Sequence, residues 1–294
     1  MTKSAFIAIV GKPNVGKSTL LNALINKKVA IVSPKVQTTR YNITGVLTEG
    51  DNQFVFIDTP GMHKPIHQLG SIMDKGAENT LYDADVVCWV VDRPFHQSDE
   101  RVLKRIEKSG LPVILVINKI DKLESKTHID EIILSFIHRY DFKEVIPISA
   151  LSQTHIDKLK EALTQYLIEG PHYFPDDEVT DQNDERRMAE LIREKILYHT
   201  EEEVPHSVAV FIEHLEQNKE LNTIDVNAVI IVERDSQKGI LIGKNGERLK
   251  RIGTEARKDI NRILNMKIHL TLWVKVKENW RNDPGSIERY GYGE

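Results

Sequence analysis

The chain has little cysteine, and this shortage limits its chemistry. Cys88 is the one cysteine among 294 residues, so no internal disulfide can form. It lies within the apolar run at residues 84–91, where a buried strand is expected and a thiol would be inert. We therefore predict a structural Cys88 in a chain that works in the reducing cytoplasm.

Membrane-spanning runs, targeting segments and a strong net charge are also missing. No apolar run approaches the roughly 20 residues that a membrane helix needs. The first four residues lead directly into a strand-length apolar run, which predicts no secretory signal. A formal net charge of -4, with 29% charged residues and no low-complexity tract, is typical of a globular protein. Any surface that binds nucleic acid must therefore be local.

The first part of the chain alternates apolar runs of strand length with amphipathic stretches. Strands are predicted at residues 6–10, 54–57, 86–91, 113–117 and 145–148, and helices at 97–109 and 126–140. The run Glu49-Gly50-Asp51-Asn52 predicts a hairpin turn. This pattern favours an α/β domain whose mostly parallel sheet has helices on both faces and one antiparallel strand pair.

The pattern changes after Gly170, where Pro171, Pro175 and an acidic cluster predict a linker at residues 173–183. We predict a first domain at residues 1–172 and a smaller α+β domain with a C-terminal tail at 184–294. The second domain should contain a helix at 184–200, strands at 207–215, 226–233 and 268–277, and a helical segment at 243–264. In the tail, we expect Trp280 to cover the core rather than to stack on a nucleobase.

A phosphate-binding loop is predicted between the first strand and the first helix. Its residues fit the pattern Gly-x4-Gly-Lys-Ser, in which glycines let backbone N–H groups point at phosphate oxygens. Lys17 is expected to reach the β- and γ-phosphates, and the Ser18 hydroxyl to bind Mg²⁺. The predicted loop is Gly11-Lys12-Pro13-Asn14-Val15-Gly16-Lys17-Ser18, with Thr19 adjoining it.

Three further motifs follow later strands in the order that a guanine-nucleotide site requires. Asp58-Thr59-Pro60-Gly61 supplies a carboxylate for Mg²⁺ and a glycine whose N–H can meet the γ-phosphate. In Asn118-Lys119-Ile120-Asp121, the Asp121 carboxylate can accept hydrogen bonds from guanine N1–H and the exocyclic amino group. Ser149-Ala150-Leu151 is placed so that a backbone N–H could meet guanine O6. The four motifs together predict a site for GTP and GDP.

The second domain carries a Gly-x-x-Gly loop with basic residues in and after it. Such a loop brings N–H groups against the backbone of single-stranded RNA and holds about four nucleotides. The basic residues continue through the next helix as Arg251, Arg257, Lys258 and Arg262, which gives a local positive field. The predicted RNA-binding residues are Ile240, Ile242, Gly243, Lys244, Asn245, Gly246, Arg248 and Lys250.

At these motifs the first domain resembles the translation-factor-like P-loop GTPases. Gln37-Thr38-Thr39-Arg40 is similar to the effector loop of the Era and TrmE branch, in which a threonine completes the Mg²⁺ shell, and either Thr38 or Thr39 could serve. Met62 stands where Ras-like switches carry a water-orienting glutamine, a departure that the Era group shares. Catalysis is therefore assigned to Lys17, Thr38, Thr39 and Gly61. By resemblance to the TrmE branch, Asn14 either holds K⁺ or is a simple turn residue.

The order of a GTPase domain followed by a type II K-homology (KH) fold resembles the bacterial Era GTPases over residues 6–277. The resemblance implies a monomeric, cytoplasmic GTPase that binds the 3′ end of 16S rRNA and assists 16S rRNA processing and 30S subunit assembly. The resemblance also implies peripheral contact with the inner face of the cell membrane. The alternative is a membrane-associated regulatory GTPase of cell-cycle signalling, although no basic amphipathic stripe with aromatic anchors supports it.

Overall fold

The computed structural model describes residues 1–62, 65–123, 125–219 and 222–293, and the chain divides into two compact units. The first comprises Met1–Ala30, Thr39–Lys64 and Met73–Asp181, and the second comprises Ile31–Thr38, Pro65–Ile72 and Gln182–Glu294. The main division falls between Asp181 and Gln182, at a position inside the linker predicted at 173–183. The two short segments that group with the second unit differ from the predicted domain bounds.

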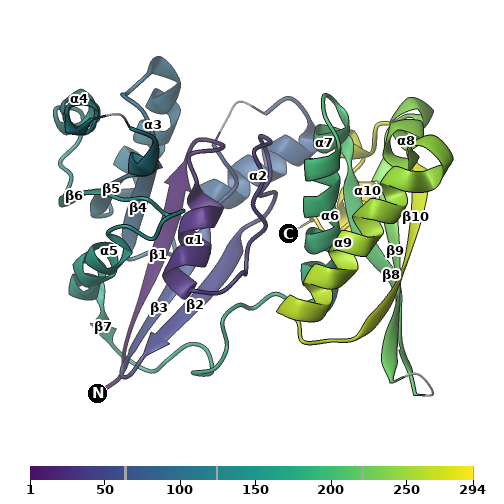
Figure 1. Cartoon of the computed structure of the whole chain (residues 1–294). Helices are drawn as coiled ribbons and strands as arrows, with labels where there is room; N and C mark the ends of the chain where they lie inside the picture. The colour runs from purple at the N-terminus through teal and green to yellow at the C-terminus, as the bar shows by residue number, and fades with distance from the viewer. Residues whose placement is uncertain (63–64, 124, 220–221, 294) are drawn as a thin grey trace. The chain divides into compact units, whose positions relative to one another are not determined.

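The first unit is built on one sheet whose strand order is β2-β3-β1-β4-β5-β6 (Figure 1). The pairs β1–β3, β1–β4, β4–β5 and β5–β6 are parallel, and β2 runs antiparallel to β3, which is the antiparallel pair that the sequence predicts. A short β7 pairs antiparallel with the start of β1 and was not predicted. The strands are β1 (Lys3–Gly11), β2 (Ile43–Glu49), β3 (Asn52–Asp58), β4 (Val86–Val91), β5 (Val113–Ile117), β6 (Glu144–Pro147) and β7 (Ile168–Glu169).

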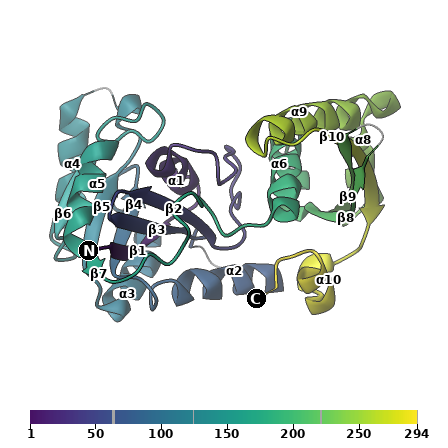
Figure 2. The same cartoon turned by 90° about the horizontal axis from the view of Figure 1, so that it is seen from below.

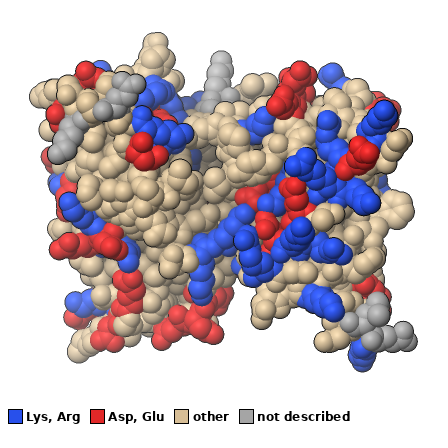
Figure 3. Space-filling model, in the orientation of Figure 1, with Lys and Arg blue, Asp and Glu red and all other residues tan. Residues whose placement is uncertain are grey.

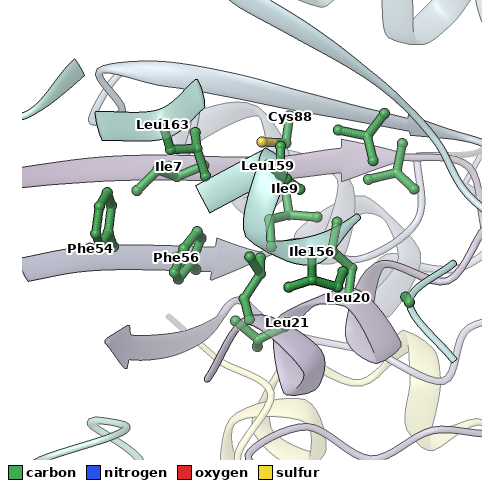
Figure 4. Packing of buried hydrophobic residues seen from close by; sticks show 14 of the residues in the cluster. Ile7, Ile9, Leu20, Leu21, Phe54, Phe56, Cys88, Ile156, Leu159 and Leu163 are labelled. Carbon is green, nitrogen blue, oxygen red and sulfur yellow. The ribbon is translucent and has the colours of Figure 1, made fainter. Parts of the chain in front are cut away.

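Helices cover both faces of this sheet because its strands are apolar on both sides. Along β1, Ile7 and Ile9 join a cluster with α1 (Lys17–Ile25) and α5 (Ile156–Leu163). The alternate residues Ala8 and Val10 join a second cluster with α3 (Glu100–Ser109), α4 (Lys126–Ile137) and the part of α2 (Gln68–Asn79) that begins at Met73. The first cluster is shown in Figure 4. Short 3₁₀ turns are η1 (Gln97–Asp99), η2 (Ile120–Lys122) and η3 (Thr164–Tyr166).

Cys88 lies on β4 in the cluster of Figure 4 and is fully buried. Burial in this apolar setting disfavours the thiolate and raises the pKa of Cys88 to about 12. A thiol with such a pKa is neither a nucleophile nor a metal ligand at neutral pH. The inert, structural cysteine predicted from the sequence is thus confirmed.

The second unit packs helices on a three-stranded sheet of order β10-β9-β8 (Figure 2). β9 and β10 are parallel, whereas β8 is antiparallel to β9 and carries an irregularity between Ile212 and His214. The strands are β8 (Ala209–Asn218), β9 (Thr223–Val232) and β10 (Ile268–Val276), and the helices are α6 (Asp184–His199), α7 (Val204–Ser207), α8 (Asp235–Ile242), η4 (Lys244–Gly246), α9 (Glu247–Ile263), η5 (Trp280–Asn282) and α10 (Pro284–Arg289).

The C-terminal tail seals this unit with aromatic side chains. Trp280 is fully buried, and its Nε1–H donates to the carbonyl of Ser207 at 2.7 Å. Tyr290 stacks on Phe211 of β8 with ring centroids 5.3 Å apart. The sequence prediction that Trp280 covers the core is confirmed. Within the described ranges, no helix combines the length and the apolarity needed to cross a membrane.

Candidate functional site

The predicted phosphate loop connects β1 to α1 in a conformation that demands its second glycine. Gly16 has a φ of 98°, and a Cβ there would lie 2.3 Å from the Nδ2 atom of Asn118. Asn14 also has a positive φ of 64°. The helix α1 begins at Lys17, so its first N–H groups and its positive dipole end face the loop. This arrangement suits an anion the size of a phosphate group.

A cluster of oxygen ligands lies beside the phosphate loop at the end of β3. Ser18 Oγ donates to Asp58 Oδ2 at 2.6 Å and lies 2.8 Å from Thr39 Oγ1. Thr39 Oγ1 is 3.4 Å from Asp58 Oδ2. The structure therefore brings together the three residues predicted to serve a metal ion. The hydroxyl of Thr38 instead donates to the carbonyl of Lys35 at 2.7 Å, so geometry favours Thr39 of the two candidates.

Burial makes this cluster receptive to a cation. Asp58 is fully buried, and burial raises its pKa from the ordinary 3.8 to about 6, against the opposing effect of the Lys17 charge and of hydrogen bonds from Ser18 and Thr39. Its Oδ1 atom makes no hydrogen bond to any described residue. Hard oxygen ligands with an unsatisfied carboxylate atom fit Mg²⁺, which would neutralise phosphate charge when bound.

Lys17 lies next to this carboxylate and is held by the loop itself. Its Nζ donates to the carbonyl of Lys12 at 2.9 Å. Burial lowers the pKa of Lys17, although the charge of Asp58 opposes that change. A desolvated ammonium group interacts strongly with phosphate oxygens because the local dielectric constant is low. Lys17 thus lies at the phosphate loop, and its contact with the β- and γ-phosphates stays a prediction.

Asn118 connects the phosphate loop to the two segments that were predicted to bind the base. Its Nδ2 donates to the carbonyl of Val15 at 2.9 Å, and its Oδ1 accepts from the backbone N–H groups of Lys119 at 2.8 Å and Ala150 at 3.0 Å. The Ala150 N–H is therefore engaged in this conformation. A contact between guanine O6 and the segment Ser149-Ala150-Leu151 stays a prediction.

The side chain of Asp121 is exposed, and its Oδ1 accepts from Ser149 Oγ at 2.5 Å, which fixes the orientation of the carboxylate. Lys119 Nζ donates to the carbonyl of Asn14 at 2.5 Å and to Asp92 Oδ2 at 2.6 Å. Its aliphatic stem therefore extends over the phosphate loop, where a base could lie against it. An exposed, oriented carboxylate beside an apolar stem can select a purine that carries N–H donors.

Gly61 and Met62 follow the Asp58 carboxylate and lie against the phosphate loop. A Cβ on Gly61 would be 2.6 Å from the backbone nitrogen of Pro13, so only glycine fits. The Met62 N–H donates to the carbonyl of Gly11 at 3.3 Å, and its side chain is buried in the cluster with α2 and α3. Met62 therefore faces the core and presents no group that could orient water. Thr59 is tied to β1 by donating from Oγ1 to the carbonyl of Ile9 at 2.9 Å.

The second unit contains a groove of about 590 Å³ between α9 and the edge strand β10. Its floor is apolar, and cations and hydroxyl groups stand at its rim. Among the described residues, the lining comes from Gly246, Leu249, Lys250, Gly253, Thr254, Arg257, His269, Leu270, Thr271 and Leu272. A shallow apolar floor with a basic rim fits unstacked bases and their phosphates.

The Gly-x-x-Gly loop opens onto this groove through Gly246. Gly243, Asn245 and Gly246 have φ values of 72°, 53° and 78°, which is the left-handed backbone that a tight turn between α8 and α9 requires. A Cβ on Gly243 would meet the Cβ of Arg248 at 2.8 Å. The Lys244 side chain is exposed and available to phosphate.

Three residues predicted for RNA contact occupy other positions. Arg248 Nη1 donates to the carbonyl of Ile240, so this guanidinium braces the end of α8. Ile240 and Ile242 lie on α8, whereas the apolar lining described above comes from Leu249 of α9 and from Leu270 and Leu272 of β10. RNA contact by Ile240, Ile242 and Arg248 stays a prediction, and parallel pairing with β9 brings the β10 part of the lining to the loop.

The solvent face of α9 carries a cluster of positively charged residues. Figure 3 shows Lys and Arg atoms gathered where α9 lies in Figure 1. Glu255 accepts from Arg251 at 3.1 Å and contacts His199 at 2.7 Å, and these two partners hold the pKa of Glu255 below its ordinary value. Arg262 is likewise paired with Asp259 at 3.0 Å. Lys250 and Arg257 are the two cations of α9 that line the groove.

The sequence of the chain matches two protein families, one in each domain. Residues 6–119 match the 50S ribosome-binding GTPase family, and residues 203–281 match the KH domain family. GTPase Era of Clostridioides difficile (strain 630) is 47% identical over 296 residues, which cover 100% of both chains. Two crystal structures of Era match with a TM-score of 0.94 and 40% identity over 100% of both chains. One is an Aquifex aeolicus variant bound to GDP and AlF₄⁻, and the other is a complex with MgGDPNP and nucleotides 1506–1542 of 16S ribosomal RNA.

The fold and the site thus define a P-loop GTPase that carries a C-terminal KH domain. Identity over the whole length then places the chain plainly in the Era family of GTPases.

Proposed function

We propose that this GTPase is a switch that binds the 3′ end of 16S rRNA in the α9–β10 groove and assists 16S rRNA processing and 30S subunit assembly. The observation that carries the proposal is the groove itself. A positive-φ Gly-x-x-Gly loop, an apolar floor and the cations Lys250 and Arg257 occur together in a chain that hydrolyses GTP. The Era structure with a GTP analogue and nucleotides 1506–1542 of 16S rRNA supports the choice of RNA.

Binding of a synthetic RNA of that sequence tests the proposal directly. Fluorescence anisotropy would compare the full chain loaded with Mg²⁺ and a GTP analogue against the chain loaded with GDP. We expect tighter binding in the GTP-analogue state, since a switch requires different RNA affinity in the two nucleotide states. Equal affinity in both states would refute the switch, and binding no tighter than to a scrambled RNA would refute the RNA assignment.

Charge variants test whether the groove is the binding surface. Lys250→Gln and Arg257→Gln should each weaken binding and reduce the slope of log affinity against log salt by about 1. Lys143→Gln is a matched control, because Lys143 lies in the first unit and pairs with the exposed Asp141 at 2.9 Å. An equal loss in the control would show that the effect comes from net charge and not from the groove.

The role in assembly is testable in cells by depletion and replacement. Depletion should cause unprocessed 16S rRNA to accumulate and lower the fraction of mature 30S subunits in sucrose gradients. Replacement by the Lys250→Gln variant should restore less than replacement by Lys143→Gln. Normal 16S ends in depleted cells would refute the proposed role.

We further propose that K⁺ at Asn14 compensates charge during hydrolysis. The buried Met62 leaves the reaction without a water-orienting side chain at that position, and Asn14 holds a positive φ in the phosphate loop. Hydrolysis should be faster in KCl than in NaCl, and Asn14→Ala should remove that difference. Equal rates in both salts would refute the proposal.

A further inference from the structure

The side chain of Lys12 makes an ion pair that is largely buried. Lys12 Nζ lies 3.0 Å from Asp99 Oδ1, and only 12% and 7% of the two side chains are exposed. The same ammonium group donates to Ser98 Oγ. Asp99 Oδ2 in turn accepts from the backbone N–H of His96 at 2.9 Å. The capping turn at the start of α3 therefore fixes the Asp99 carboxylate through one oxygen, and the other oxygen pairs with Lys12.

The backbone of residues 12 and 13 contacts Lys17 and Gly61, the two residues expected nearest to a γ-phosphate. The Lys12 carbonyl accepts from Lys17 Nζ at 2.9 Å. The next residue, Pro13, lies so close to Gly61 that a Cβ there would be 2.6 Å from its nitrogen. A displacement of residues 12 and 13 would therefore move Lys17 and Gly61 relative to each other. Misplacement on the order of 1 Å can cost about 10²-fold in rate.

We propose that Asp99 is a positioning residue for GTP hydrolysis that acts through Lys12. It holds the phosphate loop at the end where the γ-phosphate reacts. Because GDP lacks that phosphate, the pair matters for the hydrolysis rate and little for GDP affinity. The inference is independent of RNA binding, and it is tested in the absence of RNA.

A neighbouring carboxylate on the same connection between β4 and α3 provides a contrast. Asp92 Oδ2 holds Lys119 Nζ at 2.6 Å, at the end of the site where the base is read. Asp92→Asn should therefore weaken GDP and GTP binding together. Asp99→Asn should lower the single-turnover hydrolysis rate roughly tenfold and change GDP affinity by less than about twofold. An identical pattern in the two variants would overturn the assignment of Asp99.

A double-mutant cycle in the full chain shows whether Asp99 acts through Lys12. Lys12→Met should slow hydrolysis about as much as Asp99→Asn, and the double variant should be no slower than either single variant. Lys12→Arg keeps a cation within reach of Asp99 and should retain most of the rate. Losses that multiply in the double variant would overturn the proposal, because they would mean that the two side chains act separately.

The remaining measurements separate positioning from a loss of folding. Asp85→Asn is the matched control, since the Asp85 carboxylate also accepts a backbone N–H, from Phe6 at 2.7 Å, at the start of β4. It should leave hydrolysis unchanged. If Asp99→Asn lowers GDP affinity, melting temperature and hydrolysis rate in parallel, its role is structural and the proposal is overturned.

Discussion

Removing the charge of Asp58 should stabilise the nucleotide-free chain against unfolding. The same substitution should abolish Mg²⁺ binding at the predicted metal site. The carboxylate is fully buried, and burial raises its pKa from 3.8 to about 6. A rise of that size corresponds to about 3 kcal/mol by which folding disfavours the ionised form. The substitution Asp58→Asn keeps the shape and removes the charge, so the free energy of unfolding should increase at neutral pH.

The raised pKa of Asp58 makes the stability of the wild type depend on pH. A carboxyl group with a raised folded-state pKa binds its proton more tightly in the folded state, so wild-type stability falls as pH rises from about 4 through about 6. The advantage of Asp58→Asn should accordingly grow from about 1 kcal/mol at pH 4.5 to about 3 kcal/mol at pH 7.5.

Urea unfolding of both proteins across this range, without nucleotide and with EDTA present, measures the difference. Mg²⁺ with GDP should then stabilise the wild type much more than the variant, because the metal neutralises the wild-type carboxylate. A variant that is no more stable than the wild type at pH 7.5, or an advantage that does not change with pH, would refute the electrostatic account of this site.

Substitutions at three other positions test separate parts of the structure. Asp121→Asn should shift preference from guanosine toward xanthosine nucleotides by at least roughly 100-fold, measured by competition binding, and an unchanged preference would contradict the base contact. Gly61→Ala should slow hydrolysis about 10²-fold while GDP still binds, because the new Cβ would lie 2.6 Å from Pro13; wild-type turnover would contradict that packing. Trp280→Ala should cost about 3–5 kcal/mol of unfolding free energy, whereas Trp280→Phe should lose less; equal losses would show that the ring does not carry the packing.

The sequence was most informative where function depends on neighbours in the chain. The phosphate loop and the Gly-x-x-Gly loop each place their own residues at short spacing, and the structure forms both turns where they were predicted. The apolar runs of strand length likewise predicted the mostly parallel sheet, because a strand buried on both faces is apolar along its whole length, and the turn at residues 49–52 predicted the antiparallel pair of β2 and β3.

The sequence could not show contacts between residues far apart in the chain. Asp99 is 87 positions from Lys12, and no motif links the two. The groove lining from β10 depends on parallel pairing with β9, and β7 is too short to leave a pattern. The choice between Thr38 and Thr39 also needed coordinates, because adjacent residues of one type differ only in the direction of their side chains.

The edge position of β10 has a consequence for how the groove could read a ligand. A strand at the margin of a sheet offers a row of backbone N–H and C=O groups on its outer side. Recognition through such a row resembles the addition of one more strand to the sheet. It tolerates amino-acid substitutions along β10, because every residue supplies the same backbone donor and acceptor. The same openness invites unwanted pairing with other chains, and the charged Lys275 and Lys277 near the end of β10 discourage it.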